Sequence, residues 1–515
     1  MREQLPITRS DVRLYPDPCR VVARPYLPAD VWPADGPNRI QRLIDRVLEL
    51  PADEITPAIA DVRRRFSDRH EDFDALCAGS LEEIRTIAEV PDGLSADLQA
   101  LLGAYFLHEY SIEAAALTNP SIVTAPDQTG TPSGSVRVIV SLRGVGEGHI
   151  SSIQLRTGLI GPGGTVHIDE PHHPLLGRRY PPLFDKAVFI ATLKELAVSG
   201  ASEAQAEQVH RAFADPGHNP VEQALAPLED RFTMPQLEVV LRHFELPGVA
   251  PDAAARAKST IHWLADSNYE LAFPARSHPS QRVLFPKGPS ESHGMEDARF
   301  VRFTQDDGSA LYLGTYTAYD GFHILPQLIE TQDFSTFRIG TLSGSAARNK
   351  GIAIFPRRIG GRYVALARSD AENNYLMFSD HLRVWEETHR IQVPVRPWEL
   401  MQIGNSGAPI ETEAGWLVIT HGVGPLRTYA LGAMLLDLDD PRKVLSHLPE
   451  PLLVPQEDER DGYVPNVVYS CGQIVHDGTL VIAYGASDTE TRFASLPLDT
   501  LLRELTDPSA SVGSG

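Results

Sequence analysis

The chain of 515 residues has only 3 cysteines, and they lie far apart, at Cys19, Cys77 and Cys471. Their spacing fits neither a zinc site nor the disulfide framework of a small secreted domain. No apolar run approaches the ~20 residues that a bilayer-spanning helix needs. The first residues also lack the hydrophobic centre of a signal peptide. We therefore expect a reduced, cytoplasmic protein with no metal site and no membrane contact.

Basic residues are scarce relative to acidic ones. The chain has 46 Lys and Arg against 68 Asp and Glu, which gives a formal net charge of −22. A surface of this sign repels a phosphate backbone at long range, so we expect no nucleic-acid partner. A small anion can still bind where basic side chains gather locally. With 42% hydrophobic residues, the composition is typical of a globular protein that buries a core.

Helical and β-type patterns alternate along the chain. Residues 1–115 are expected to form a helical region, because apolar residues recur at helical spacing from Asn38 onward, whereas the first 30 residues show no clear period. Residues 116–505 show β-branched residues at strand spacing and predict the main domain. A second helical stretch, at about 181–266, interrupts this domain as an insertion. We expect a flexible tail at 506–515.

A weak internal repeat occurs in the β region. The segments TQDFSTFR near Asp333, FSDHLRVWEE near Asp380 and LLDLDDPRKV near Asp439 each follow a strand-like segment and precede a turn. A period of ~40–50 residues that holds about four strands is typical of a β-propeller blade. A β-sandwich with similar turns arising by chance is the alternative. In a propeller, ligand-binding residues from several blades meet at the central channel, so the chemistry should be spread along the sequence.

The densest polar cluster among apolar residues is ESHGMEDARFVRF at 291–303. Glu296, Asp297 and Arg299 stand directly before a strand-like segment, and Gly294 allows a close backbone approach. A carboxyl group here can act as a general acid if burial raises its pKa. The structural alternative is an Asp–Arg ion pair that holds the end of a strand.

Basic residues gather at 345–374 in this otherwise acidic chain. Three arginines fit the solvated turn of a hairpin: Arg357, Arg358 and Arg362. Four residues that flank the strands fit either a structural role or an oxyanion site: Arg348, Asn349, Lys350 and Arg368. Two later clusters offer His421 with Tyr429, and Tyr469 with Asp488. A lone histidine or a turn aspartate is more often structural than catalytic, and both interpretations stay open here.

Taken together, these segments resemble glycoside hydrolase family 130, the β-mannoside phosphorylases and β-mannosidases. The resemblance covers roughly residues 115–170 and 270–505. Its elements come in family order: NPSI at 119–122, SLRGVGEGHISSI at 141–153, GMEDAR at 294–299, NKGIAIFP at 349–356, the region ending in Arg368, THGVG at 420–424 with Tyr429, and VPNVVYSCG to YGASD at 464–488. It implies a mainly β fold, a five-bladed β-propeller, with the helical N-terminal region and the helical insertion as additions to the family core.

The resemblance also implies an inverting mechanism with one protein acid, which maps to Asp297. In a phosphorylase this acid protonates the glycosidic oxygen through a sugar hydroxyl, and phosphate attacks C1 from the opposite face to give mannose 1-phosphate. Phosphate needs no second carboxylate base, but it does need a cationic cradle. The residues implied for this cradle are Arg348, Asn349, Lys350, Arg368, His421 and Tyr429. Those implied for the sugar site are Asn119, Arg143, Glu296, Arg299, Gln402 and Asp488.

One position departs from the phosphorylase pattern, since Gln402 stands where phosphorylases of the family carry a lysine. Loss of one cation weakens phosphate binding, but Arg368 and His421 remain. We expect an inverting β-mannoside phosphorylase that uses a small manno-oligosaccharide, inorganic phosphate as co-substrate and no cofactor. An inverting β-mannosidase, which needs a base to activate water, is the first alternative. A catalytically silent sugar-binding propeller is the second. The helical additions are candidates for an oligomer interface or for a cap over the sugar channel.

Overall fold

The computed structural model describes residues 5–28, 38–199, 220–244 and 251–507. It divides into two compact units. The smaller unit consists of Asp17–Ala114 and His172–Leu175, and the larger consists of Met1–Pro16, Ala115–Pro171 and Leu176–Gly515. In sequence, the smaller unit is therefore inserted into the larger one. Most of the predicted tail, residues 508–515, lies outside the described residues.

The smaller unit combines helices with a two-stranded ribbon. Its elements are β2 (Val21–Pro25), α1 (Arg39–Leu48), α2 (Ala52–Phe66), η1 (Ser67–Arg69), α3 (Phe73–Arg85), α4 (Ala96–Tyr105) and β3 (Leu107–Ser111). Asn38, Asp72 and Ser95 cap α1, α3 and α4, each by accepting a hydrogen bond from a backbone N–H of the first turn. The apolar helix faces then meet in one cluster that includes Ile44 and Leu102. The ribbon β2–β3 has no counterpart in the helical prediction for this region.

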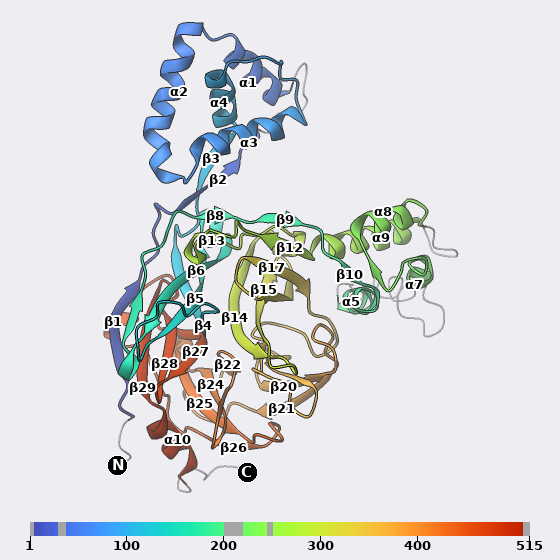
Figure 1. Ribbon diagram of the computed structural model, residues 1–515. Coiled ribbons are helices and arrows are strands. Elements are labelled where there is room, and N and C mark those ends of the chain that lie inside the picture. Colours follow the sequence, from blue (N-terminus) through green and yellow to red (C-terminus); the bar gives the residue numbers. More distant parts are fainter. Residues whose placement is uncertain (1–4, 29–37, 200–219, 245–250, 508–515) are drawn as a thin grey trace. The chain divides into compact units, whose positions relative to one another are not determined.

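The larger unit is mainly β (Figure 1). In chain order its longer strands can be divided into five groups, of which the first two belong to one ten-stranded sheet, joined where β14 pairs parallel with β6. The groups are, first, β4 (Ala116–Thr124), β5 (Val136–Val145), β6 (Ser151–Ile160) and β7 (Val166–Ile168); second, β14 (Gly294–Thr304), β15 (Ala310–Tyr319), β16 (Ile324–Thr331) and β17 (Thr336–Thr341); third, β18 (Ala353–Ile354), β19 (Tyr363–Ala367), β20 (Asn374–Ser379) and β21 (Glu387–Gln392); fourth, β22 (Gln402–Asn405), β23 (Ile410–Thr412), β24 (Gly415–Val423), β25 (Tyr429–Leu436) and β26 (Val444–His447); fifth, β27 (Val468–His476), β28 (Thr479–Ala486) and β29 (Glu490–Pro497). Neighbouring strands within each group pair antiparallel.

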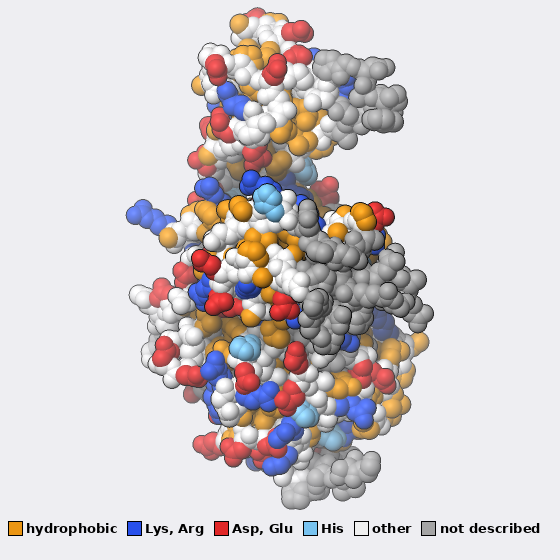
Figure 2. Space-filling view, turned by 90° about the vertical axis from the view of Figure 1, so that its right-hand side faces the viewer, with side chains coloured by type: hydrophobic (Ala, Val, Ile, Leu, Met, Phe, Trp, Pro, Cys, Tyr) orange, Lys and Arg blue, Asp and Glu red, His pale blue; other side chains and the backbone are white. Residues whose placement is uncertain are grey.

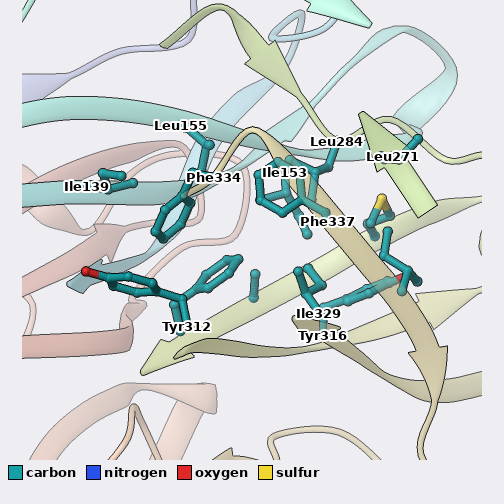
Figure 3. Packing of buried hydrophobic residues seen from close by; sticks show 14 of the residues in the cluster. Ile139, Ile153, Leu155, Leu271, Leu284, Tyr312, Tyr316, Ile329, Phe334 and Phe337 are labelled. Carbon is teal, nitrogen blue, oxygen red and sulfur yellow. The ribbon is translucent and has the colours of Figure 1, made fainter. Parts of the chain in front are cut away.

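The core of the larger unit lies between these groups. One cluster joins the first group to the second, and Figure 3 shows Ile139 and Leu155 from the first packed near Tyr312 and Phe334 of the second. Further clusters join the second group to the third, the third to the fourth and the fourth to the fifth. Another joins the fifth back to the first, through Phe493 and Val140 among others. Burial between successive sheets is the main source of stability in such an arrangement.

The fifth group is completed by β1 (Thr8–Leu14), which pairs antiparallel with β29 (Figure 1). Thr8 lies opposite Ser495, and Leu14 lies opposite Thr491. The sequence patterns did not predict this strand. Its residues are exposed or half-buried, so the hydrophobic alternation is weak, and its partner lies at the other end of the chain.

The insertion at about 181–266 contains helices that share one apolar cluster, which includes Phe232 and Ile261. The elements between the first and second groups are β8 (Leu175–Leu176), β9 (Arg178–Tyr180), β10 (Phe184–Asp185), α5 (Lys186–Ser199), α7 (Pro220–Ala224), β11 (Arg231–Phe232), α8 (Met234–Arg242), α9 (Pro251–Asp266), β12 (Tyr269–Ala272) and β13 (Arg282–Val283). The segment SEAQAEQVHRAFA, which has a helical pattern, lies outside the described residues. The remaining elements are α10 (Leu498–Thr506) and the short 3₁₀ turns η2 (Glu147–His149), η3 (Pro162–Gly164), η4 (Pro279–Gln281), η5 (Pro289–Glu291), η6 (Pro425–Arg427) and η7 (Glu457–Glu459).

Charges of both signs are interspersed on the face seen in Figure 2. Among the described helices, none has the length and hydropathy that crossing a bilayer requires. Within the described ranges, no group of three or more His, Cys, Asp and Glu side chains is placed to hold a metal ion.

Candidate active site

The first strands of several groups carry an irregularity at the predicted site residues. The register of β4 shifts between Thr118 and Ser121, and that of β14 shifts between Glu296 and Arg299. Asn119 and Asp297 stand inside these shifts with φ of 50° and 56°. Asn and Asp are the non-glycine residues that best tolerate positive φ, and such backbone strain is concentrated at functional sites. Asn349, shortly before β18, has the same feature with φ of 67°.

Asp297 is held from two sides by residues of the first group. The Nδ2 of Asn119 donates a hydrogen bond of 2.5 Å to Asp297 Oδ1, and Arg143 Nη1 lies 3.6 Å from the same oxygen. Gly294, at the start of β14, lets the backbone of β14 lie close to that of β6, because a Cβ atom at this position would come within 2.8 Å of Ser151 N. The Asp297 side chain keeps 13% of its surface exposed. A substrate group can therefore still reach the carboxylate.

Glu296 links two of the predicted cations. Its Oε1 accepts from Arg143 Nη2 at 2.8 Å, and its Oε2 accepts from Lys350 Nζ at 2.7 Å. Arg143 is fixed further by a 2.8 Å hydrogen bond from its Nε to Ser151 Oγ. Much of the charge of Lys350 is therefore balanced by a carboxylate, although 40% of the lysine side chain is exposed.

Arg299 is buried and links the backbone at Asp297 to Ser406 and Tyr469. Its Nη1 donates to the backbone carbonyl of Asp297 at 3.0 Å, its Nε donates to the carbonyl of Ser406 at 2.6 Å, and its Nη2 donates to Tyr469 Oη at 2.6 Å. The predicted Asp–Arg alternative is thus realised differently, since Arg299 fixes the backbone of Asp297 while Arg143 faces its carboxylate. This arrangement spans the second, fourth and fifth groups of strands.

Arg368 and His421 come together over the backbone of β22. A Cβ atom at Gly404 would lie 2.5 Å from His421 Cε1 and 2.6 Å from Arg368 Cδ. Arg368 also lies close to Gly351, where a Cβ atom would be 3.2 Å from Arg368 Cδ and 3.8 Å from Arg299 Nη2. Among the residues that the structure describes, neither ring nitrogen of the fully buried His421 has a hydrogen-bond partner, and neither does Arg368 Nε. An imidazole N–H and the Arg368 Nε–H are buried donors suited to an anion.

Two tyrosines line the same histidine. The His421 ring lies 4.9 Å from the Tyr469 ring and 6.2 Å from the Tyr429 ring, measured between centroids. Gln402, at the position where a lysine is expected, points its Nε2 to Tyr429 Oη at 3.4 Å. Asp488 lies near Asn119 instead, where it accepts a hydrogen bond from Thr118 Oγ1 at 3.4 Å.

Arg348 is the predicted cradle residue that the structure draws away from this cluster. Its Nη2 lies 2.8 Å from Glu195 Oε1 on α5, and half of its side chain is exposed. Asn349 caps the backbone of Lys350 with its own side chain. The arginines predicted for the hairpin turn form ion pairs at the surface: Arg357 with Glu411, Arg358 with Asp306 and Arg362 with Glu387.

The electrostatics of the site shift the pKa values of Asp297 and Asp488 in opposite directions. Burial raises the pKa of Asp297, but the nearby Arg143, Arg299 and Lys350 lower it more. The pKa therefore lies below its ordinary value, and the carboxyl group stays ionised to a lower pH than usual. Burial raises the pKa of Asp488, and the negative charge of Asp297 adds to this effect against Arg143. Burial, with Arg368 and Arg299 nearby, holds the pKa of His421 well below 6.5, so the ring is neutral at pH 7.

Several supporting residues were missed by the sequence prediction. Thr118 lies next to both Asn119 and Asp488, and Ser151 fixes Arg143. The carbonyl of Ser406 and the amide of Asn405, which donates to Gly351 O at 2.8 Å, fix the floor of the site. Small polar residues in or beside strands show no pattern in a single sequence, so nothing in their spacing distinguished them.

Comparisons with known proteins find relatives that are mannoside phosphorylases. The family model for glycoside hydrolase family 130, described as beta-1,4-mannooligosaccharide phosphorylase, matches residues 264–506. A 1,2-beta-oligomannan phosphorylase of Thermoanaerobacter sp. (strain X514) is 36% identical over 227 residues, which cover 42% of this chain and 72% of that protein. A beta-1,2-mannobiose phosphorylase of Listeria innocua is 32% identical over 231 residues, covering 43% of this chain and 63% of that protein.

Among solved structures, the beta-1,2-mannobiose phosphorylase of Listeria innocua in complex with beta-1,2-mannobiose is similar with a TM-score of 0.42 and 20% identity. The match covers 77% of this chain and 93% of that one. A structure from Bacteroides ovatus, described as a putative glycoside hydrolase, gives a TM-score of 0.44 at 17% identity, over 76% of this chain and 89% of that one.

Proposed function

The chain belongs to glycoside hydrolase family 130, and from this premise we propose that it is an inverting phosphorylase of β-mannosides. The observation that carries the proposal is the meeting of one carboxylate, Asp297, with cations and unpaired donors from several groups of strands. The substrate is a manno-oligosaccharide, the co-substrate is inorganic phosphate, the product is mannose 1-phosphate, and no cofactor takes part.

Asp297 is the proposed proton donor. Asn119 orients its carboxyl group, and Arg299 fixes its backbone, so the proton can be delivered at a defined place. The surrounding cations keep Asp297 ionised in the absence of substrate. Binding of phosphate adds negative charge, which offsets those cations and raises the pKa of Asp297. The donor is therefore loaded with its proton when phosphate is present, and phosphate binding should take up a proton.

His421, Arg368 and Tyr429 are the proposed core of the phosphate site, with Asn349 and Lys350 at its edge. The neutral His421 donates one N–H, and the Arg368 guanidinium supplies the charge. Arg348 joins this site when Glu195 releases it. Arg143, Glu296, Asn119, Gln402 and Asp488 are proposed to contact the sugar, whereas Arg299 supports them from below.

A β-mannosidase is the second candidate, and Gln402 favours it. The phosphorylase pattern has a lysine at this position, and the charge of Lys350 is partly balanced by Glu296. A site with fewer free cations holds phosphate less firmly. Water then competes for the anomeric carbon and gives free mannose.

We also propose that the larger unit is a five-bladed β-propeller. Five groups of strands, with a hydrophobic cluster between each group and the next and another between the last and the first, support a five-bladed β-propeller. The described cysteines Cys19, Cys77 and Cys471 are unpaired, which supports a cytoplasmic location. We keep the helical additions as the proposed interface of a homo-oligomer.

The test is phosphate-dependent cleavage of β-1,2- and β-1,4-mannobiose, followed by ³¹P NMR. We expect α-mannose 1-phosphate, the inverted anomer, and at least tenfold slower sugar release without phosphate. Equal release of free mannose without phosphate identifies the hydrolase instead. Asp297→Asn should abolish either reaction. Asp306→Asn is the matched control, because Asp306 is exposed and pairs only with Arg358 among the ion pairs described.

A further inference from the structure

A tyrosine–histidine pair stands at the rim of the site, and the mechanism above does not use it. Tyr463 keeps 51% of its surface exposed. Its hydroxyl lies 3.0 Å from His149 Nδ1. The two ring centroids are 5.9 Å apart, with 33° between the ring planes. Both residues come from segments that the family resemblance includes, but neither was assigned a role.

The backbone presents both rings outward. His149 has a φ of 62° and follows Gly148, with a φ of 66°, in the turn between β5 and β6. This strained turn is closed by hydrogen bonds from His149 N to Gly146 O and from Gly146 N to Ile150 O. A side chain that is held in strained backbone at the surface points to a function in contact with a ligand.

Both members of the pair adjoin the catalytic cluster. Tyr463 N donates to Thr489 Oγ1 at 2.7 Å, and Val464 N donates to Ser487 O at 2.9 Å, so these bonds flank Asp488 on both sides. On the other side, the turn that carries His149 lies between Arg143 and Ser151, which are hydrogen-bonded to each other. The pair therefore stands beside Arg143 and Asp488, on the exposed side of the cluster.

We propose that Tyr463 and His149 form the platform for the second sugar ring of the substrate, the ring that leaves on cleavage. This inference rests on the proposed function. A pyranose has an apolar C–H face that packs on an aromatic ring and hydroxyls that bond to a phenol or an imidazole, and this pair offers both. The first ring must place its anomeric carbon near Asp297 among buried polar groups. The exposed pair is suited to the ring beyond it.

The reverse reaction separates the two sugar positions. In that direction mannose 1-phosphate fills the first position and the phosphate site, and a free sugar acceptor fills the second. For Tyr463→Ala we expect the KM of the acceptor to rise about five- to twentyfold. The KM of mannose 1-phosphate should change less than about twofold, because that substrate does not touch the platform. Tyr463→Phe keeps the stacking surface and should show a smaller increase.

Tyr26→Ala is the matched control. Tyr26 is 53% exposed and also packs against a histidine, His108, but it lies in the smaller unit. This variant should leave both KM values unchanged. The inference is overturned if Tyr463→Ala leaves the acceptor KM within twofold of wild type, or if it raises the KM of mannose 1-phosphate equally. Thermal unfolding of each variant shows whether the fold is kept, and Tyr463→Phe supplies the test if the alanine variant does not fold.

Failure of the proposed function is distinguishable from failure of this inference. If the wild-type protein forms no mannose 1-phosphate and hydrolyses no β-mannoside, the proposed function fails. Isothermal titration with β-1,2- and β-1,4-mannobiose then tests the platform by binding alone. Weaker binding to Tyr463→Ala than to wild type supports the platform, whereas equal binding, or no binding to either, overturns it.

Discussion

Replacing Asn119 tests how the carboxylate is held in place. The Asn119 amide donates to Asp297 Oδ1 at 2.5 Å, and hydrogen bonds to charged groups contribute about 1.5–3 kcal/mol. Asn119 also stands at φ 50°, where alanine costs about 1 kcal/mol more than glycine or asparagine. We therefore expect Asn119→Gly to lose the amide contribution only, and Asn119→Ala to lose about 1 kcal/mol more in the free energy of unfolding.

The effect on activity should be the same in both variants. Without the amide, the Asp297 carboxyl is no longer fixed, and its pKa rises because a hydrogen bond to the charged form is lost. A loss of 1.5–3 kcal/mol corresponds to about a 10- to 100-fold decrease in kcat/KM. Steady-state kinetics of phosphorolysis and denaturant unfolding measure the two effects separately.

A double-mutant cycle with Asp297→Ala completes this test. The coupling energy in the unfolding measurements should reach about 1 kcal/mol or more, since the two side chains are in direct contact. Asn119→Gly with wild-type kcat/KM, or a coupling energy near zero, refutes the reasoning that Asn119 positions the acid.

Three further predictions concern other parts of the chain. His421 is buried and neutral with a lowered pKa, so below pH 6.5 the unfolded chain binds more protons than the folded one, and stability falls as pH decreases. In urea titrations at several pH values, His421→Asn should remove this part of the dependence of stability on pH, up to about 1.4 kcal/mol per pH unit. An unchanged dependence contradicts the assignment. Glu195→Gln should release Arg348 and lower the KM for phosphate by a few-fold at most, as expected for a half-exposed ion pair. A higher KM contradicts this prediction, because it means that Glu195 supports phosphate binding. Gly79→Ala in α3, where a Cβ atom meets nothing within 4 Å, should stabilise the smaller unit by about 0.5–1 kcal/mol in thermal unfolding, and destabilisation argues against the described helix.

Local sequence patterns predicted the strands of the larger unit better than the start of the chain. The segment SVRVIVSL corresponds to β5, whose β-branched residues alternate between two core clusters, Ile139 in one and Val138 and Val140 in the other. By contrast, β1 has weak alternation and pairs with β29 across almost the whole chain, so no short window contains its partner. The ribbon β2–β3 was missed for a similar reason, because Val22 and Tyr110 pair across the whole helical stretch that separates them in sequence.

The site could be predicted only by residue type and family order. Asp297 and Asn119 carry the motifs, but their contact depends on two register shifts in strands far apart in sequence. The meeting of Arg368 with His421 depends on the absence of a side chain at Gly404. The pairing of Arg348 with Glu195 involves a helix outside the family core, which no motif describes.

The pairing of β1 with β29 determines how the two units can be separated experimentally. The smaller unit interrupts the larger one between Pro16 and Ala115, so it is not an N-terminal appendage that can be cut away. A chain that started at Ala115 would also lack β1, exposing the unpaired backbone of β29 to other molecules. Joining residue 16 to residue 115 through a short linker would keep that strand and remove the helices α1 to α4 together with the ribbon β2–β3.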